Sequence, residues 1–492
     1  MKKIILILIL LIAGVVLIGV FERINNDDFE TARAQVFGRY SRGLTRFFKP
    51  ITYQSGWPQI INGEAGTPVV IDDINADGNN ELIIYSAVDL DGRANAKIYI
   101  FNPDGTLLPG WPVTPPDDPV GSQIAVGDVN NDGFKEIAGY SRTKLFLFDH
   151  LGHLVNGWPT NPINAFVNAS APVIEDVEGV GGLREVIVAT AGLGEIPPKV
   201  YVFNGDGSIK SGWPVTLPGE SFSSVGVGDV DNDGKKEIVV ASILMLVSPI
   251  INQIEIRVFA PDGTLESGWP KILPYGNTLP PTSSPVIGNL DQDLQLEIVF
   301  ASPDGKVYAF NHNGSTVSGG WPFITGGSAV FMSPVALADV DNNGDIEIIF
   351  GGWRSDSSSG YGVYVLNHDA SIFSGWPKKH IGTVRGSPTA GDIDGDGDIE
   401  ILVADEASEN SRVYAWHHNG RTVKGFPLKG EAGLLTFQKS SPVLNDLDKD
   451  GDIEVAAGGD DNKVYVWDLK GRFPSRLEWQ NYQHNSERIG RY

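Results

Sequence analysis

The chain has 492 residues, with 61 acidic side chains against 37 basic ones, a formal net charge of −24 and no cysteine. The absence of cysteine excludes disulfides, cysteine-ligated zinc or iron–sulfur centres and a cysteine nucleophile. The acidic balance argues against nucleic acid as a partner, because phosphate binding needs clustered Lys and Arg. Glycine is frequent, at 59 residues, which predicts many tight turns.

Residues 1–21 have the pattern of a membrane-targeting segment. Lys2 and Lys3 precede 18 uncharged, mostly aliphatic residues that end at Phe21. An apolar helix of this length can just span a bilayer, and no small-x-small cleavage site follows directly. We expect a single-pass signal-anchor helix with the remainder on the extracytoplasmic side of the cell membrane. Secretion after signal cleavage is the alternative.

Residues 22–52 differ in composition from both of their neighbours. This segment is rich in arginine and aromatic residues. We expect a juxtamembrane stalk, which either contacts anionic lipid or acts as a solvated spacer.

From residue 53 onward one acidic segment recurs eight times, with start-to-start spacings of 48 to 60 residues. Its pattern is Asp-x-Asp/Asn-x-Asp-Gly-x-x-Glu. The third copy is damaged and one residue longer. The copies occupy residues 73–81, 128–136, 176–185, 229–237, 289–297, 339–347, 392–400 and 446–454.

A second marker keeps the same period. Gly-Trp-Pro occurs seven times and Gly-Phe-Pro once, each 16 to 20 residues before an acidic segment. Their aromatic residues are Trp57, Trp111, Trp158, Trp213, Trp269, Trp321, Trp376 and Phe426. Two markers that share one period establish a repeat of about 50 residues.

Each repeat predicts four short strands, A to D, because runs of β-branched and aromatic residues alternate with Gly, Asn and Asp turns. Four strands per repeat are typical of a β-propeller blade. The first Gly-Trp-Pro ends a D strand that lacks its own A, B and C strands, and the last repeat lacks a D strand. We therefore predict an all-β, eight-bladed propeller over residues 53–470, in which the N-terminal D strand completes the last blade. A seven-bladed ring with an extra unit is the alternative. The tail, residues 471–492, would pack on the ring.

The acidic segments predict metal-binding loops between strands A and B. Oxygen side chains at positions 1, 3, 5 and 9 can converge on one hard cation, and Gly at position 6 permits a positive φ. Oxygen-only ligands favour calcium over magnesium, which resists dehydration. The predicted ligands are Asp73, Asn75, Asp77, Glu81, Asp128, Asn130, Asp132, Glu136, Asp229, Asp231, Asp233, Glu237, Asn289, Asp291, Asp293, Glu297, Asp339, Asp341, Asn343, Glu347, Asp392, Asp394, Asp396, Glu400, Asp446, Asp448, Asp450 and Glu454. The third copy is expected to bind nothing, and the fifth deviates because it starts with Asn and lacks the Gly.

These loops, followed by runs such as Glu-Ile-Val-Val-Ala-Ser, resemble the FG-GAP/VCBS-type repeats of integrin-α-like β-propellers. The resemblance covers about residues 53–470 and implies calcium in the A–B loops. The family's Phe-Gly and Gly-Ala-Pro signature is only loosely present. Integrin ligand binding also needs a partner domain, for which this chain has no counterpart.

The B–C loops vary in length, and variable loops on a rigid scaffold are where binding is usually found. Trp353, Arg354 and Tyr361 are the candidate ligand contacts. The apolar run 243–247 predicts an extension of a hairpin.

The expected function is a membrane-anchored, extracytoplasmic, calcium-binding module for a surface protein or glycan. A calcium-dependent polysaccharide lyase and a structural cell-surface module are the alternatives. No nucleophile elbow, HExxH motif or phosphate loop occurs, so we expect no catalytic residue. The sequence does not indicate an oligomeric state.

Overall fold

The computed structural model describes residues 50–492 apart from residues 66, 88–95, 117–122, 142–143, 161–170, 193–195, 248–249, 276–282, 326–329, 355–361, 380–381, 406–411, 431–440, 460, 470–475 and 481. Of residues 1–49 it describes only the strands β1 (Ile7–Ile12) and β2 (Val15–Val20), which pair antiparallel. Two compact units result, residues 1–50 and 51–492. The expected anchor helix, stalk and cleavage alternative lie mostly outside the described residues and stay predictions. No helix among the described residues is long and apolar enough to cross a membrane.

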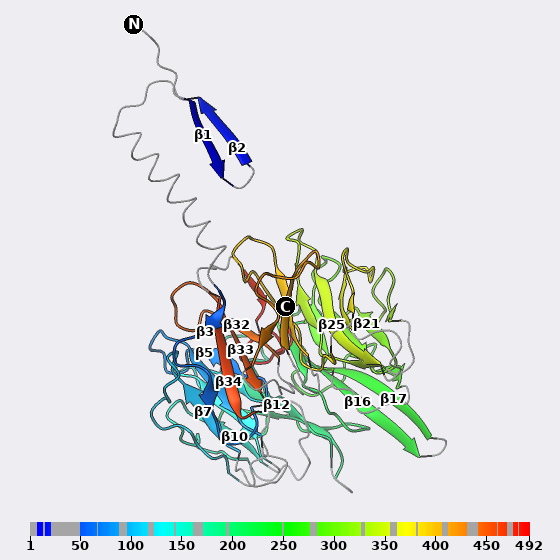
Figure 1. Cartoon of the computed structure of the whole chain (residues 1–492). Coiled ribbons are helices and arrows are strands. Elements are labelled where there is room, and N and C mark those ends of the chain that lie inside the picture. Colours follow the sequence, from blue (N-terminus) through cyan, green and yellow to red (C-terminus); the bar gives the residue numbers. More distant parts are fainter. Residues whose placement is uncertain are drawn as a thin grey trace. The chain divides into compact units, whose positions relative to one another are not determined.

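The second unit is an eight-bladed β-propeller, which confirms the all-β prediction and shows that the seven-bladed alternative is wrong (Figure 1). Its A strands are β5 (Val70–Asp72), β8 (Ala125–Gly127), β11 (Val173–Glu175), β15 (Gly226–Gly228), β19 (Val286–Gly288), β24 (Ala336–Ala338), β28 (Thr389–Gly391) and β32 (Val443–Asn445). Its B strands are β6 (Glu81–Tyr85), β9 (Glu136–Tyr140), β12 (Glu185–Ala189), β16 (Glu237–Val247), β20 (Glu297–Ser302), β25 (Glu347–Arg354), β29 (Glu400–Ala404) and β33 (Glu454–Gly459).

The outer half of each blade follows the same order. The C strands are β7 (Ile98–Phe101), β10 (Leu145–Phe148), β13 (Lys199–Phe203), β17 (Ile250–Phe259), β21 (Lys306–Phe310), β26 (Gly362–Leu366), β30 (Arg412–His417) and β34 (Lys463–Asp468). The D strands are β14 (Val215–Thr216), β18 (Lys271–Pro274), β22 (Phe323–Ile324), β27 (Lys378–Lys379), β31 (Leu428–Lys429) and, for blade 8, β4 (Gln59–Ile60). In blade 1 the D position is a single bridge between Ile98 and Val113.

The N-terminal segment closes the ring, as predicted, but the D strand follows the Gly-Trp-Pro motif and does not end in it, since β4 comes after Trp57. β3 (Thr52–Tyr53) and β4 both pair with β34, the last C strand, so residues 52–60 complete blade 8. The A strands of neighbouring blades contact one another around the inside of the ring. Closure removes the exposed sheet edge that an open array of blades would leave.

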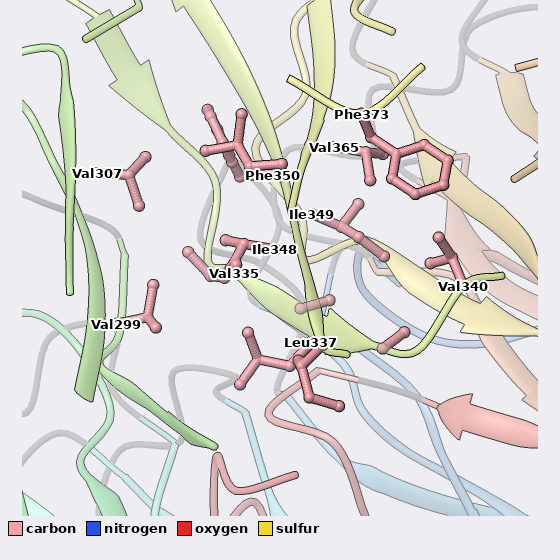
Figure 2. Packing of buried hydrophobic residues seen from close by; sticks show 14 of the residues in the cluster. Val299, Val307, Val335, Leu337, Val340, Ile348, Ile349, Phe350, Val365 and Phe373 are labelled. Carbon is pink, nitrogen blue, oxygen red and sulfur yellow. The ribbon is translucent and has the colours of Figure 1, made fainter. Parts of the chain in front are cut away.

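The core lies between the blades, and the inward faces of strands A to C are buried throughout. Figure 2 shows Val299 and Val307 of blade 5 opposite Val335, Ile348 and Phe350 of blade 6. All five residues are fully buried. Complete burial of each such side chain contributes about 1.5–3 kcal/mol, so the blades stabilise one another through their flat apolar faces.

The Gly-Trp-Pro motif links each blade to the next. The indole Nε1 of each of the seven tryptophans donates to a main-chain carbonyl in the C–D turn of the following blade, at 2.6–3.1 Å. The preceding glycine is required at this contact: Gly212 has φ +90°, and a Cβ there would lie 1.9 Å from the carbonyl oxygen of Asp262. Phe426, which has no indole, is the only copy that cannot make this hydrogen bond.

The C-terminal tail lies along the A strands inside the ring. Its strand β35 (Leu477–Trp479) pairs with β28. Outside the tail, a short strand β23 (Val330–Met332) pairs with β25 of blade 6. Further along the tail, the carbonyls of Ser486, Glu487, Ile489 and Gly490 accept hydrogen bonds from the A strands of blades 2, 3, 4 and 5. The fully buried Arg488 donates to carbonyls of blades 1 and 2.

Blade 4 has the longest hairpin of the described blades. β16 and β17 pair continuously from Ile238↔Phe259 to Val247↔Ile250, and they extend beyond the other blades (Figure 1). The apolar run 243–247 is therefore a strand extension, as predicted.

Candidate metal centres on the A–B loops

All eight acidic segments occupy the same place in the fold. Each begins directly after an A strand, and its glutamate at position 9 is the first residue of the B strand. The eight glutamates are all buried, with exposures between 0% and 6%. The chain therefore places a buried carboxylate at the start of the second strand of every blade.

Main-chain hydrogen bonds hold each loop in a tight coil, which blade 1 illustrates. Gly78 N–H donates to Asp73 Oδ2 at 3.0 Å, Asp77 N–H to Asn75 Oδ1 at 3.0 Å, and Ile74 N–H to Glu81 Oε2 at 3.1 Å. Gly78 has φ +92°, a conformation that disfavours any side chain. These bonds leave Asp73 Oδ1 and Glu81 Oε1 buried without a donor.

Several carboxylate oxygens of the acidic loops are buried without a hydrogen-bond donor. Among the described residues they include Oδ1 of Asp73 and Oε1 of Glu81, Glu297 and Glu347. A buried carboxylate oxygen without a partner is costly, so this arrangement fits a cation that supplies the missing interaction.

The structure brings the predicted ligands together. In at least four loops of the described part of the chain, one oxygen from each of three carboxylates lies within 4.8 Å of the other two. These sets are Asp229/Asp231/Glu237, Asp291/Asp293/Glu297, Asp339/Asp341/Glu347 and Asp392/Asp394/Asp396. The loops of blades 1, 2 and 8 have the same bonding pattern at position 9. Each cluster could hold a metal ion.

Burial and repulsion from neighbouring carboxylates both disfavour charge on the position 9 glutamates. Burial, then the loop aspartates, raise the pKa of Glu81, Glu136 and Glu297 to about 7 and of Glu237 and Glu347 to about 8. For Glu400 the same causes raise the pKa to about 7, and for Glu454 to about 9. Without a cation these loops therefore resist full ionisation at neutral pH.

The third loop has its own cation. Lys210 Nζ lies 2.9 Å from Glu185 Oε1 and 3.3 Å from Glu178 Oε1, which are the carboxylates at positions 9 and 3. Burial disfavours charge on this ammonium, but the two carboxylates outweigh that effect and raise the pKa of Lys210. Sequence reasoning missed Lys210. The available signal was a lysine three residues before Trp213 in the one repeat whose loop is damaged.

The fifth loop differs at the positions where its sequence departs from the pattern. The amide Nδ2 of Asn289 donates to the Asp293 carbonyl at 2.7 Å, and its Oδ1 accepts from Gln292 N–H. Leu294 replaces the glycine and is 75% exposed. The carboxylates of Asp291, Asp293 and Glu297 still converge.

The seventh loop is contacted by an imidazole from the neighbouring C strand. His417 Nδ1 lies 2.9 Å from Glu400 Oε1. His417 is the last residue of β30 and thus comes from the strand next to Glu400 in the sheet.

The candidate ligand contacts at residues 353–361 are not tested by the structure. The backbone of Trp353 and Arg354 ends β25 and pairs with β23. Their side chains and the whole of Tyr361 lie outside the described residues.

Comparisons with known proteins agree with this geometry. The sequence profile of the family described as FG-GAP-like repeat matches residues 73–139, 182–240 and 289–350. The first and third matches each begin on one acidic loop and include the next, and the second match includes the loop of blade 4. No curated protein matches the chain in sequence.

Three solved structures are similar over most of their length. Quinohemoprotein alcohol dehydrogenase from Comamonas testosteroni has a TM-score of 0.56 and 12% identity, over 87% of this chain and 78% of that one. The enzyme ADHIIG from Pseudomonas putida HK5 has a TM-score of 0.53 and 11% identity, over 86% and 76%. The V. cholerae biofilm matrix protein Bap1 has a TM-score of 0.43 and 14% identity, over 89% and 95%.

At such identities the two dehydrogenases support the fold alone. The matches to the repeat profile start at or near acidic loops, and the structure arranges these loops in eight successive blades. The chain is therefore an FG-GAP-repeat β-propeller.

Proposed function

We propose that the seven loops other than the third bind calcium. The ligand atoms are carboxylate and amide oxygens, which suit a hard cation that accepts six to eight oxygens in irregular geometry. Magnesium demands a near-ideal octahedron and dehydrates reluctantly, so it fits these loops less well.

The contact of Lys210 with the third loop carries this proposal. In that loop an ammonium lies between the carboxylates at positions 3 and 9. In the fourth loop the corresponding carboxylates, Asp231 and Glu237, converge with Asp229. In the one copy that has lost the metal pattern, a lysine supplies positive charge beside the carboxylates at positions 3 and 9.

We further propose that the propeller is an extracytoplasmic binding module for a surface protein or glycan. Calcium sites of extracellular modules work at Kd values of about 10⁻⁴–10⁻³ M, because free calcium is abundant outside the cell. Cation binding would stiffen the face that carries the A–B loops, while the opposite face carries loops of variable length. Residues 1–21 would anchor this module to the membrane, or be removed on secretion.

The first test is the melting temperature of the full chain with calcium and with a chelator. Calcium should raise the melting temperature, because it binds the folded loops and not the unfolded chain. Equal melting temperatures in both conditions would refute calcium binding.

The second test is a screen of the full chain against surface proteins and glycans, in calcium and in chelator. Calcium-dependent capture of one class supports the binding module. Cleavage of an acidic glycan would instead support a lyase, and binding to nothing in either buffer would leave a structural role.

A further inference from the structure

His417 is the first residue of the C–D turn of blade 7. The hydrogen bond that closes this turn is described in seven blades, and in the other six this position is not a histidine. The residue after Trp416 or its counterpart donates its N–H to the carbonyl four residues later. Its equivalents are Asn102, Asp149, Asn204, Ala260, Asn311 and Asn367. In blades 1, 3, 5 and 6 the asparagine amide bonds the turn itself. In blade 7 the side chain contacts the acidic loop instead.

The imidazole completes a mixed group of ligand atoms. One atom each from Asp394, Glu400 and His417 lies within 4.8 Å of the other two. Glu400 is 0% exposed and His417 is partly buried, so the group lies at the inner end of the loop rather than on its rim.

The distance between Glu400 and His417 suits two neighbouring ligands of one small ion. Metal–nitrogen and metal–oxygen bonds of about 2.0–2.2 Å place adjacent ligand atoms about 3 to 3.5 Å apart, so this pair would need to separate only slightly. His417 Nδ1 and Glu400 Oε1 are 2.9 Å apart.

We propose that the blade 7 loop takes a first-row transition-metal ion of the Zn²⁺ type through Asp394, Glu400 and His417. Imidazole nitrogen is a common ligand for such ions, whereas calcium and magnesium take oxygen. This inference rests on the proposal that the A–B loops are cation sites, and it gives one of them a different specificity. The ring would then carry two kinds of metal centre.

The test uses the full chain in millimolar calcium, titrated with Zn²⁺ by calorimetry and with Co²⁺ by visible absorption. The wild type should bind a single Zn²⁺ that calcium does not displace, and Co²⁺ should show d–d bands typical of nitrogen ligation. His417→Asn installs the residue of blades 1, 3, 5 and 6, so the turn is preserved. This variant should weaken Zn²⁺ binding by at least about tenfold, the lower end of what losing even an outer partner of a metal ligand costs.

Two further variants make the result decisive. His312→Gln changes a histidine in the blade 5 turn and should leave Zn²⁺ binding unchanged. Asn367→His places an imidazole beside the blade 6 loop and should create a second Zn²⁺ site. Equal Zn²⁺ affinity in the wild type and His417→Asn, or no Zn²⁺ retained in calcium, would overturn the proposal.

Failure of this inference can be told apart from failure of calcium binding. His417→Asn should still gain melting temperature with calcium through the other six loops. A loss of Zn²⁺ binding with retained calcium stabilisation supports both ideas. Zn²⁺ binding without any calcium effect would sustain the blade 7 site and refute calcium at the others.

Discussion

The acidic loops of blades 3 and 8 differ in the side chain that contacts their carboxylates. In blade 3, Lys210 precedes Trp213 by three residues and forms ion pairs with Glu178 and Glu185. In blade 8 the same position is Gln54, three residues before Trp57, and its amide Nε2 donates to Asp448 Oδ2. A neutral amide leaves the acidic cluster of blade 8 with its charge, whereas the ammonium of blade 3 neutralises part of its own.

On the proposal that the other loops bind calcium, each blade has a positive charge beside its buried position 9 glutamate, from a lysine in blade 3 and from a bound ion elsewhere. A lysine provides it permanently. A solvent cation provides it only when the surrounding concentration is high enough, so the stability of the other loops would depend on the medium.

Removing the cation from the whole ring should have the largest effect. A site with free calcium at 100 times its Kd contributes about 2.7 kcal/mol, so several sites together should lower the melting temperature by about 10 °C or more when chelated. Scanning calorimetry with calcium and with a chelator measures this shift. A shift confined to a degree would mean that the seven loops do not need a cation, unlike the third.

The pH dependence of the metal-free protein should be the next largest effect. The position 9 glutamates have folded pKa values raised from 4.5 to about 7 to 9, so the folded state holds more protons than the unfolded state in this interval. The free energy of unfolding should therefore fall as pH rises from about 4.5 to 8, because protons favour the folded form.

Calcium should remove or reverse this slope, since it binds the ionised carboxylates. Melting curves at several pH values, with and without calcium, provide the measurement. A metal-free protein that becomes more stable between pH 5 and 8 would contradict the raised pKa values.

Lys210→Met should cost about 1–3 kcal/mol of unfolding free energy, because the buried Glu185 loses its partner while Glu178 is 42% exposed. Denaturant unfolding in chelator measures the loss. Lys199→Met is the matched control in the same blade, because Lys199 forms no ion pair among the described residues. Equal stabilities of the two variants would show that Lys210 does not act as the cation of loop 3.

Gln54→Lys should give the blade 8 loop a lysine at the position of Lys210 in blade 3. Its effect on stability should be the smallest of the four. The ammonium would approach Asp448, so the chain should bind one calcium ion fewer and lose slightly less stability on chelation. Equilibrium dialysis gives the stoichiometry. Gln59→Lys in β4 is the control, and a calcium count unchanged in Gln54→Lys would break the equivalence of the two positions.

The sequence predicted what is repeated. Two markers with one period yielded eight blades, and the incomplete first and last repeats predicted that residues 52–60 would pair with β34. The convergence of the loop carboxylates followed from their alternate spacing, since the tight coil needs only local hydrogen bonds.

What occurs only once could not be predicted. The path of residues 476–492 depends on main-chain bonds to strands hundreds of residues away, which leave no periodic signal. Lys210 and His417 stand at positions that vary among repeats, and their roles depend on contacts across the sheet. Comparing the repeats position by position would have singled out both residues, although not what they contact.

The two elements that complete the ring stand at opposite ends of the folded unit. Residues 52–60 pair with strand β34, and residues 476–492 bond the A strands. Neither contact can form until synthesis has passed residue 463, so the apolar face of blade 1 that packs on blade 8 stays uncovered until then. Contacts over such separations are slow to form and leave intermediates prone to aggregation. If the chain is exported as proposed above, folding should finish only after translocation of the last blade.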